Sequence, residues 1–324
     1  MGKNPVSTME NIKSMCPAFS IIIPHYDIPD LLMRCLKSIP VSEDIQVIVV
    51  DDNSPDADTY LERYPELSRP YLEFIRAPKN GGAGYARNIG LDHARGKWLL
   101  FADADDFFVD NMHDIITMHV ESDADVIYFQ KQAVYSDNLN RKSSRSDFID
   151  EIMDVYLKTG DELPIRTRYV VPWGKMIKKS LIEKYHIRFE EIRYSNDVFF
   201  SKRAGCYAKK IEGIDTVLYI LTYRVGSLCF DFCSKPDEIR TRADVAFRSD
   251  LFLLNYNMCQ ERETAPYLVR MLRLDRNLFK YYFARLDEIY PSKIAALKDI
   301  SKDHSFRFKI KFYLYSLLVW AKIL

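Results

Sequence analysis

Short apolar runs without polar alternation recur along the first half of the chain, and stretches with helical spacing lie between them. The runs that predict strands are residues 19–24 (FSIIIP), 45–50 (IQVIVV), 71–75, 98–102 and 125–130. The stretches that predict helices are residues 30–39, 83–94 and 109–119. Strands without alternation that are separated by helices are typical of a parallel sheet covered on both faces. The pattern therefore predicts an α/β fold with a Rossmann-like, mostly parallel sheet flanked by helices.

The second half of the chain departs from this alternation. Residues 136–147 (SDNLNRKSSRSD) are polar and predict a mobile loop, whereas residues 216–223 predict one more strand. Beyond Ser234, apolar residues recur at i, i+3 and i+4, which is typical of helices. The predicted parts of the chain are an N-terminal tail over 1–17, an α/β domain over 18–230 and a C-terminal helical region over 231–324.

Three of the predicted parallel strands run directly into polar residues. His25-Tyr26 follows the first strand, Asp51-Asp52 follows the second, and residues 103–106 (DADD) follow the fourth. Open α/β sheets bind their ligands outside the carboxyl ends of the strands. We therefore expect these three strand ends to line one crevice.

The acidic stretch FADADD (residues 101–106) has two interpretations. Asp103 and Asp105 are two positions apart, so along an extended strand end they point the same way and can hold a hard divalent cation together with phosphate oxygens. The alternative is a solvated turn in which Asp105 or Asp106 caps the next helix. The neighbouring Asp51-Asp52 pair favours the cation.

The segment NGGAGYARNIGLDHARG supplies a second candidate feature. Gly82-Ala83-Gly84 begins like a dinucleotide fingerprint, but Arg87 stands where the third glycine should be, which disfavours NAD. From the first turns of a helix, the Arg87 guanidinium can reach a base or a phosphate. The alternative is a surface arginine, and the adjacent glycines, which let a ligand approach the backbone, weigh against it.

Composition excludes several classes of protein. Lys+Arg and Asp+Glu both number 46, so no net charge draws the chain to nucleic acid or to an acidic surface. The six cysteines lack zinc-ligand spacing, which predicts reduced thiols in a cytoplasmic protein. The first residues lack the apolar core of a signal peptide.

The last residues, 306–324 (FRFKIKFYLYSLLVWAKIL), combine aromatic and basic side chains. The uncharged stretch 312–321 is far shorter than the roughly 20 residues that span a bilayer. The composition favours a helix in a membrane interface, hence peripheral membrane contact at the inner face of the cytoplasmic membrane. The alternative is a terminal helix docked on the preceding helices.

Taken together, these segments resemble a known family. The stretches FSIIIPHYDIPDLLMRCLKSI, IVVDDNSPD and NGGAGYARNIGLDHARGKWLLFADADD are similar, in order and spacing, to family 2 glycosyltransferases with the GT-A fold over about residues 18–110. PWGKMIKKSLI, SNDVFFS and YRVGSL extend the resemblance to about residue 228. The resemblance implies that residues 18–230 form a GT-A glycosyltransferase domain.

The resemblance also implies roles for the strand-end residues. Asp52 would accept a hydrogen bond from a uracil-type base, in a pocket shaped by Pro24 and Tyr26 with Arg87 beside it. Asp103 would bind the ribose hydroxyls. Asp105 would ligate Mn²⁺ or Mg²⁺ bridging the diphosphate of the nucleotide-sugar donor, where a metal stabilises the departing nucleoside diphosphate.

In the family, an aspartate of a Glu-Asp pair deprotonates the acceptor, and the reaction inverts the anomeric centre. Asp197 matches this aspartate, while Asn196 replaces the glutamate. An alternative role for Asp197, compatible with the first, is to cap the helix that follows.

Three further residues carry weaker assignments. Trp173 either stacks on a sugar ring or belongs to the core. Arg224 and Ser227 would close over the donor phosphates.

The resemblance implies an inverting, metal-dependent enzyme that moves a sugar from a nucleotide-diphosphate donor, expected to be UDP-linked, to a glycan or lipid-linked glycan in surface polysaccharide synthesis. One rival is a nucleotidylyltransferase, which would need a glycine-rich loop where this chain has HYDIPD. A second rival is a catalytically inactive module that binds a nucleotide or glycan.

Overall fold

The computed structural model describes residues 16–224, 235–259 and 262–302, together with residues 309, 312, 313, 315–317 and 319. The chain divides into two compact units, Met1–Arg224 and Val225–Leu324, and each is described by itself.

The first unit is built on one sheet. Within the described residues its strands are β1 (Phe19–His25), β2 (Ile45–Asp51), β3 (Leu72–Arg76), β4 (Trp98–Phe101), β5 (Phe107–Phe108), β6 (Val126–Tyr135), β7 (Asn138–Lys142), β8 (Lys175–Lys178) and β9 (Ile211–Tyr223). They lie in the order β3-β2-β1-β4-β8-β6-β9-β5, and β7 pairs with β6. The first four pair in parallel, β8 runs antiparallel to both β4 and β6, and β6 and β9 are parallel. The sheet is therefore mixed, with a parallel half that carries the predicted strand ends.

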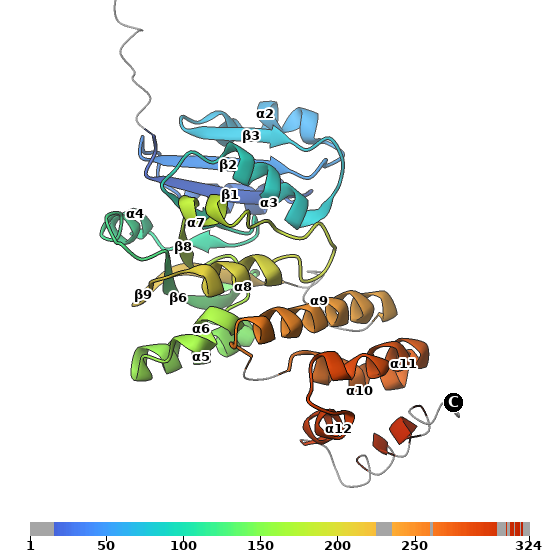
Figure 1. Ribbon diagram of the computed structural model, residues 1–324. Coiled ribbons are helices and arrows are strands. Elements are labelled where there is room, and N and C mark those ends of the chain that lie inside the picture. The colour runs from blue at the N-terminus through green and yellow to red at the C-terminus, as the bar shows by residue number, and fades with distance from the viewer. Residues whose placement is uncertain are drawn as a thin grey trace, which may run out of the picture. The chain divides into compact units, whose positions relative to one another are not determined.

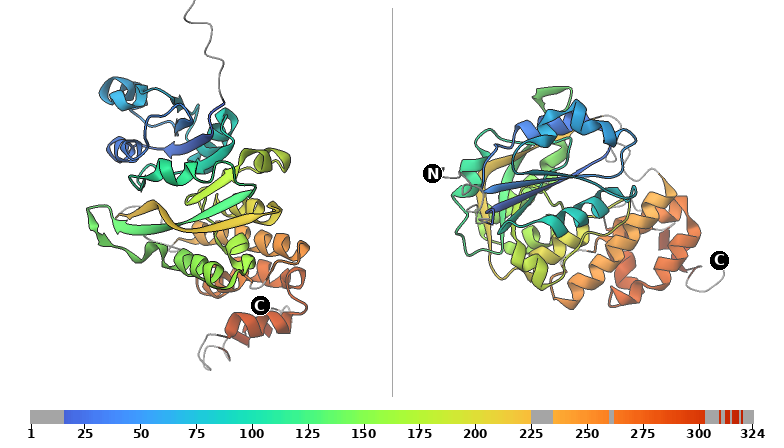
Figure 2. Two further views of the ribbon diagram at one scale, coloured as in Figure 1. Left: turned by 90° about the vertical axis from the view of Figure 1, so that its left-hand side faces the viewer. Right: turned by 90° about the horizontal axis from the view of Figure 1, so that it is seen from above.

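Helices cover both faces of this sheet. The described helices of the first unit are α1 (Pro29–Lys37), α2 (Tyr60–Arg63), α3 (Gly82–His93), α4 (Met112–Thr117), α5 (Asp147–Thr159), α6 (Glu162–Arg168), α7 (Lys179–Lys184) and α8 (Val198–Tyr207). Short 3-10 segments are Ala57–Thr59, Pro65–Ser68 and Ser144–Ser146. Figure 1 shows α3 packed on one face of the parallel strands, and the view from above in Figure 2 shows α1, in blue, on the other face. This coverage explains why these strands lack polar alternation, since both faces of β1 and β2 are buried.

The polar side chains inside the parallel half are paired. The Ser20 hydroxyl donates to Gln46 Oε1 (2.7 Å), which also accepts from the backbone N–H of Arg95 (2.9 Å). Gln46 Nε2 donates to the His93 carbonyl (3.0 Å), and the N–H of Gly96 donates to Ser20 Oγ (2.8 Å). These bonds tie the chain leaving α3 to the interior of β1 and β2.

The expectation of a mobile loop over residues 136–147 is wrong. Residues Asn138–Lys142 form β7, which returns along β6 as a hairpin, and Asp147 already begins α5. All five side chains of β7 are exposed. An exposed strand needs no apolar face, and β7, with Leu139 as its one apolar residue, carries no apolar run that would predict it.

The second unit is helical, as predicted. Its described helices are α9 (Pro236–Asn255), α10 (Thr264–Leu274), α11 (Arg276–Ala284) and α12 (Lys293–Ser301), with a 3-10 turn at Leu286–Glu288. It has an apolar core of its own, which includes Ile239, Phe247, Leu268, Phe279 and Phe283.

Nowhere in the described part of the chain is a helix long and apolar enough to cross a membrane. Most of residues 306–324 lie outside the described residues, so the two interpretations of that segment stay predictions.

We predict that Gln46→Leu lowers the free energy of unfolding by about 1–3 kcal/mol, because the buried Ser20 hydroxyl and the His93 carbonyl lose the partners that Gln46 supplies. The matched control is Gln132→Leu, the same change at an exposed position of β6. Urea unfolding of both variants measures the difference. Equal effects of the two substitutions would contradict the role of this network.

Candidate active site

The three predicted strand ends are neighbours in the sheet. β1 lies between β2 and β4, and His25 is in register with Asp51. Asp103 lies two positions after Phe101, the last residue of β4. One edge of the sheet therefore collects the polar ends of all three strands, as expected.

Asp51 is an internal anchor at this edge. It is fully buried, and its Oδ1 contacts His25 Nδ1 at 2.9 Å and accepts from the Ser54 hydroxyl at 2.6 Å. Because His25 Nε2 accepts from the N–H of Ile28 (3.2 Å), the imidazole carries its proton on Nδ1 and donates it to Asp51. Burial opposes ionisation, but the hydrogen bonds from His25 and Ser54 outweigh it and hold the pKa of Asp51 below its ordinary value.

Asp52 reaches from the end of β2 to the start of α3. Its Oδ1 accepts from the N–H of Gly81 (2.8 Å) and its Oδ2 from the N–H of Gly82 (2.7 Å). Gly82 has φ +84°, a conformation that side chains rarely adopt. Burial raises the pKa of Asp52, although the two N–H bonds oppose the rise. Each carboxylate oxygen keeps a second acceptor position, so Asp52 can still bind an N–H of a ligand.

Pro24 and Tyr26 bracket the same strand end. Pro24 is the sixth residue of β1 and is buried, while the Tyr26 side chain, two residues on, is 47% exposed. The base pocket that the resemblance implies for these two residues stays a prediction.

Arg87 joins two parts of the site. It is 5% exposed, and its Nη2 donates to Asp103 Oδ1 (2.6 Å) while its Nη1 donates to Asn196 Oδ1 (2.9 Å). The guanidinium also lies over the Phe189 ring at 5.3 Å. The surface-arginine alternative is therefore wrong. The amide of Asn196 offers Arg87 an oxygen acceptor without adding a negative charge beside Asp197.

The segment 189–197 packs directly against α3. Asn88 and Phe189 exchange two hydrogen bonds, from Asn88 Nδ2 to the Phe189 carbonyl (3.0 Å) and from the Phe189 N–H to Asn88 Oδ1 (2.9 Å). A Cβ placed on Gly84 would lie 2.1 Å from the Glu190 carbonyl oxygen. Glycine is thus required at position 84 for the helix and this segment to approach each other.

Asp197 stands at the first position before α8, as the capping alternative requires, but its side chain makes no capping hydrogen bond. Burial raises its pKa above the ordinary value, and the positive charges of Arg87 and Lys175 partly offset the rise. The role of Asp197 as the base stays a prediction.

The carboxylates of the acidic turn after β4 lie in different surroundings. Asp105 Oδ2 pairs with Arg224 Nε at 3.0 Å. Asp106 is fully buried, and it accepts from the Thr222 N–H (2.6 Å) and from the Tyr219 hydroxyl (3.0 Å). Burial, together with the charges of Asp105 and Asp103, raises the pKa of Asp106 well above its ordinary value.

The capping alternative for this turn is wrong. The next helix, α4, begins at Met112 after Asn111, and the strand β5 separates it from Asp105 and Asp106. Asp106 anchors the turn, whereas Asp103 and Asp105 keep partly exposed carboxylates.

Sequence reasoning missed Arg34 of α1. Its Nη2 donates to the backbone carbonyl of Asp105, and its guanidinium stacks over the Phe107 ring at 5.4 Å. The two bonded residues are 71 positions apart, and the amphipathic pattern of α1 gives no sign that this arginine turns inward.

The chemistry of the turn fits a shared cation. The described residues contain no group of three or more His, Cys, Asp or Glu side chains that could hold a metal alone. Asp103 and Asp105 supply carboxylate oxygens, and Mg²⁺ or Mn²⁺ is commonly bound by one or two carboxylates plus substrate phosphates and water. The residues present thus suit a metal that binds together with a diphosphate.

The remaining predicted residues are distributed as follows. Trp173 is 6% exposed, and its indole stacks on the Tyr219 ring with a centroid distance of 5.7 Å and an interplanar angle of 11°. The indole therefore packs in the core, which is the second of its two predicted roles. Its contact with a sugar stays a prediction. Ser227 lies outside the described residues.

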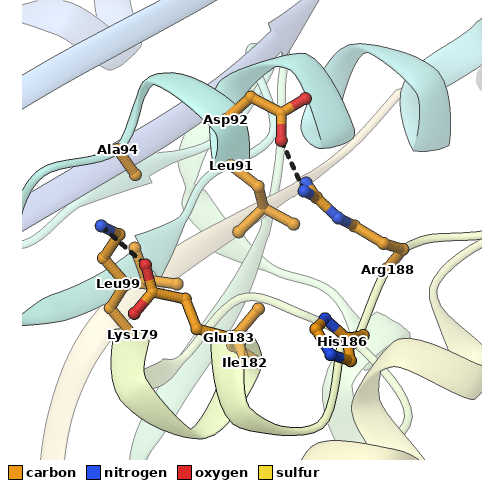
Figure 3. A pocket seen from close by; sticks show the side chains of 9 residues that line it. All are labelled: Leu91, Asp92, Ala94, Leu99, Lys179, Ile182, Glu183, His186 and Arg188. Atoms are coloured by element: carbon orange, nitrogen blue, oxygen red, sulfur yellow. Dashed lines mark ion pairs between the residues drawn. The ribbon is translucent and has the colours of Figure 1, made fainter.

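A separate pocket of about 400 Å³ lies toward the amino end of β4 (Figure 3). It is lined by Leu91, Asp92, Ala94, Leu99, Lys179, Ile182, Glu183, His186 and Arg188. Its charged side chains are paired with each other, as Asp92 with Arg188 and Lys179 with Glu183. None of the predicted site residues belongs to it.

The fold is that of the GT-A glycosyltransferases. The crystal structure of Staphylococcus aureus TarS 1–349 in complex with UDP-GlcNAc superposes with a TM-score of 0.66 at 21% identity, covering 94% of this chain and 91% of that one. Residues 20–186, just over half of the chain, match the model of glycosyl transferase family 2. The chain belongs to this family and is a glycosyltransferase, which confirms the resemblance seen in its motifs.

Curated relatives carry the same description. Glycosyltransferase GlyG of Streptococcus pneumoniae is 26% identical over 310 residues, covering 92% of this chain and 97% of GlyG. EpsH of Bacillus subtilis is 26% identical over 222 residues, covering 65% of this chain. The match spans 62% of EpsH, less than two thirds of that protein's length.

We predict that Gly84→Ala displaces segment 189–197, because the added methyl group meets the Glu190 carbonyl. Gly90→Ala on the same helix is the control, since its added methyl group meets the Ile22 side chain instead. We expect overpacking to lower the stability of both variants, by about 1–3 kcal/mol. Faster backbone amide exchange over 189–197 should appear in the Gly84 variant alone, and equal exchange in the two would refute this packing constraint.

Proposed function

We propose that this glycosyltransferase transfers a sugar from a UDP-sugar donor to a glycan or lipid-linked glycan acceptor, with inversion, in the synthesis of a surface polysaccharide. The observation that carries the proposal is the bridge made by Arg87. Its guanidinium bonds Asp103, beside the acidic turn, and Asn196, next to Asp197. The acidic turn with its candidate metal ligands and the candidate base are thereby held in one site.

On the donor side, Asp52 accepts the N–H of the uracil base, with Pro24 and Tyr26 forming the walls of the base pocket. The second acceptor position on each Asp52 oxygen supports this role. Asp103 binds the ribose hydroxyls through the carboxylate oxygen that Arg87 leaves open.

Asp105 would hold Mn²⁺ or Mg²⁺ at the diphosphate. When bound, the metal supplies Lewis-acid stabilisation of the negative charge on the leaving nucleoside diphosphate. Arg224, which pairs with Asp105, would contribute a positive charge at the same phosphates.

On the acceptor side, Asp197 takes the proton of the attacking hydroxyl. Inversion requires this base on the side of the sugar opposite the leaving group. The positive charge of Arg87 favours the ionised form of Asp197, which a base must have before the reaction.

The relatives support the class of donor and acceptor. The superposed S. aureus structure is described as a complex with UDP-GlcNAc, and the name of S. aureus TarS describes a poly(ribitol-phosphate) beta-N-acetylglucosaminyltransferase. TarS is 27% identical over 228 residues, so a UDP-linked donor and a cell-surface polymer are the expected counterparts here.

We predict that the protein binds UDP more tightly with Mn²⁺ than without it, and that Asp105→Ala abolishes this difference because the metal loses its carboxylate ligand. Asp110→Ala, at an exposed aspartate five positions on, should keep it. Calorimetric titration with UDP measures both. If the wild type binds none of UDP, GDP and dTDP, the proposed nucleotide-sugar donor fails.

We predict that Asp197→Asn lowers kcat about 10²- to 10⁴-fold and leaves UDP affinity within about twofold, since a general base contributes on this scale. Asp114→Asn, at an exposed position of α4, is the control.

The pH profile tests the same role. Because burial raises the pKa of Asp197 and the reaction needs its ionised form, kcat/KM should fall as the pH drops through a value above the ordinary range of an aspartate. A profile without an acid limb in that range would contradict Asp197 as the base.

A further inference from the structure

Two residues of β9 contact the acidic turn 103–106 at both of its ends. The Tyr219 hydroxyl accepts the backbone N–H of Asp103 (2.8 Å) and donates to Asp106 Oδ2 (3.0 Å). The Thr222 N–H donates to Asp106 Oδ1 (2.6 Å), and the Thr222 hydroxyl donates to the Asp105 carbonyl (2.6 Å). Every residue of the turn that carries a carboxylate is thus bonded to one strand more than 110 positions away.

The Tyr219 side chain is itself held firmly. It is fully buried, with its ring stacked on Trp173 and edge-on to Phe108 at 5.3 Å. Its hydroxyl uses its donor and one acceptor position on the turn, so it specifies where the Asp103 backbone lies relative to Asp106.

The bonds to β9 engage the turn through its backbone and through Asp106. The Asp103 and Asp105 carboxylates take no hydrogen bond from either residue, and their partners are Arg87 and Arg224 instead. β9 therefore fixes where the turn lies, while the two carboxylates stay partly exposed.

We propose that Tyr219 and Thr222 are positioning residues, which set the placement of the Asp103 and Asp105 carboxylates for a metal-bound nucleoside diphosphate. This inference rests on the proposed function for the identity of what the carboxylates bind. Both residues act through the turn and need no contact with the substrate. Ligand sites of this kind lose affinity when the loss of supporting hydrogen bonds allows a ligand-binding group to move by about 1 Å.

The first test compares Tyr219→Phe with Tyr169→Phe. Each removes one hydroxyl from a fully buried tyrosine that contacts Trp173, and Tyr169 has no bond to the turn. Without ligand, backbone amide exchange over residues 101–106 should quicken in the Tyr219 variant and stay unchanged in the Tyr169 variant. UDP affinity in the presence of Mn²⁺ should fall about tenfold in the first and less than twofold in the second.

A second pair of variants separates positioning from a loss of folding. Thr222→Val removes the hydroxyl that donates to the Asp105 carbonyl and keeps the shape of the side chain. Thr222→Ser keeps that hydroxyl and should restore the metal-dependent UDP affinity that the valine variant loses. Thermal unfolding of both variants shows whether any loss follows stability instead.

The outcomes are distinct. Unchanged exchange over 101–106 in Tyr219→Phe, or equal losses of UDP affinity in Tyr219→Phe and Tyr169→Phe, would overturn the positioning role. If the wild type bound no nucleotide, faster exchange confined to Tyr219→Phe would still support the role of β9 while the proposed donor failed.

Discussion

The candidate site depends on one buried cation. Arg87 is almost inaccessible to solvent, and a buried guanidinium is stable only when its desolvation is offset by well-placed acceptors. Asp103 and Asn196 are those acceptors, and they lie in two segments far apart in the sequence. The same two bonds therefore neutralise one carboxylate of the acidic turn and fix segment 189–197, with Asp197, beside it. The absence of a Cβ on Gly84 is what lets that segment come close enough.

Burial and hydrogen-bond donors divide the strand-end aspartates into two groups. Asp51 and Asp106 are fully buried anchors, yet their pKa values move in opposite directions. Hydrogen bonds from His25 and Ser54 outweigh burial at Asp51, while burial and two neighbouring carboxylates dominate at Asp106. Asp103 and Asp105 remain partly exposed. A cluster of carboxylates can thus occur at these strand ends because some of them are buried and hydrogen-bonded within the protein. Only the partly exposed ones remain to bind a ligand.

Much of the parallel half of the sheet could be predicted from the sequence. The strands β1 and β2 are buried on both faces, so their apolar runs leave little doubt about their type. The hairpin strand β7 was missed because its side chains are all exposed. The strand β9 was predicted too short because most of the side chains in its first half are only half-buried and form no apolar run. Arg34 and Tyr219 were missed because their partners in the turn lie 71 and more than 110 positions away.

The sequence by itself determined the family, the fold class and the residue types available for the chemistry, because motifs and strand-end positions are local properties of the chain. Only the tertiary structure decided which aspartates are buried anchors and which keep partly exposed carboxylates, that Arg87 bridges to Asn196, and that the Trp173 indole lies against Tyr219. The physical reason is that desolvation and hydrogen-bond partners come from strands and helices far apart in the chain. Spacing along one strand sets the direction of a side chain, but it does not set that side chain's surroundings.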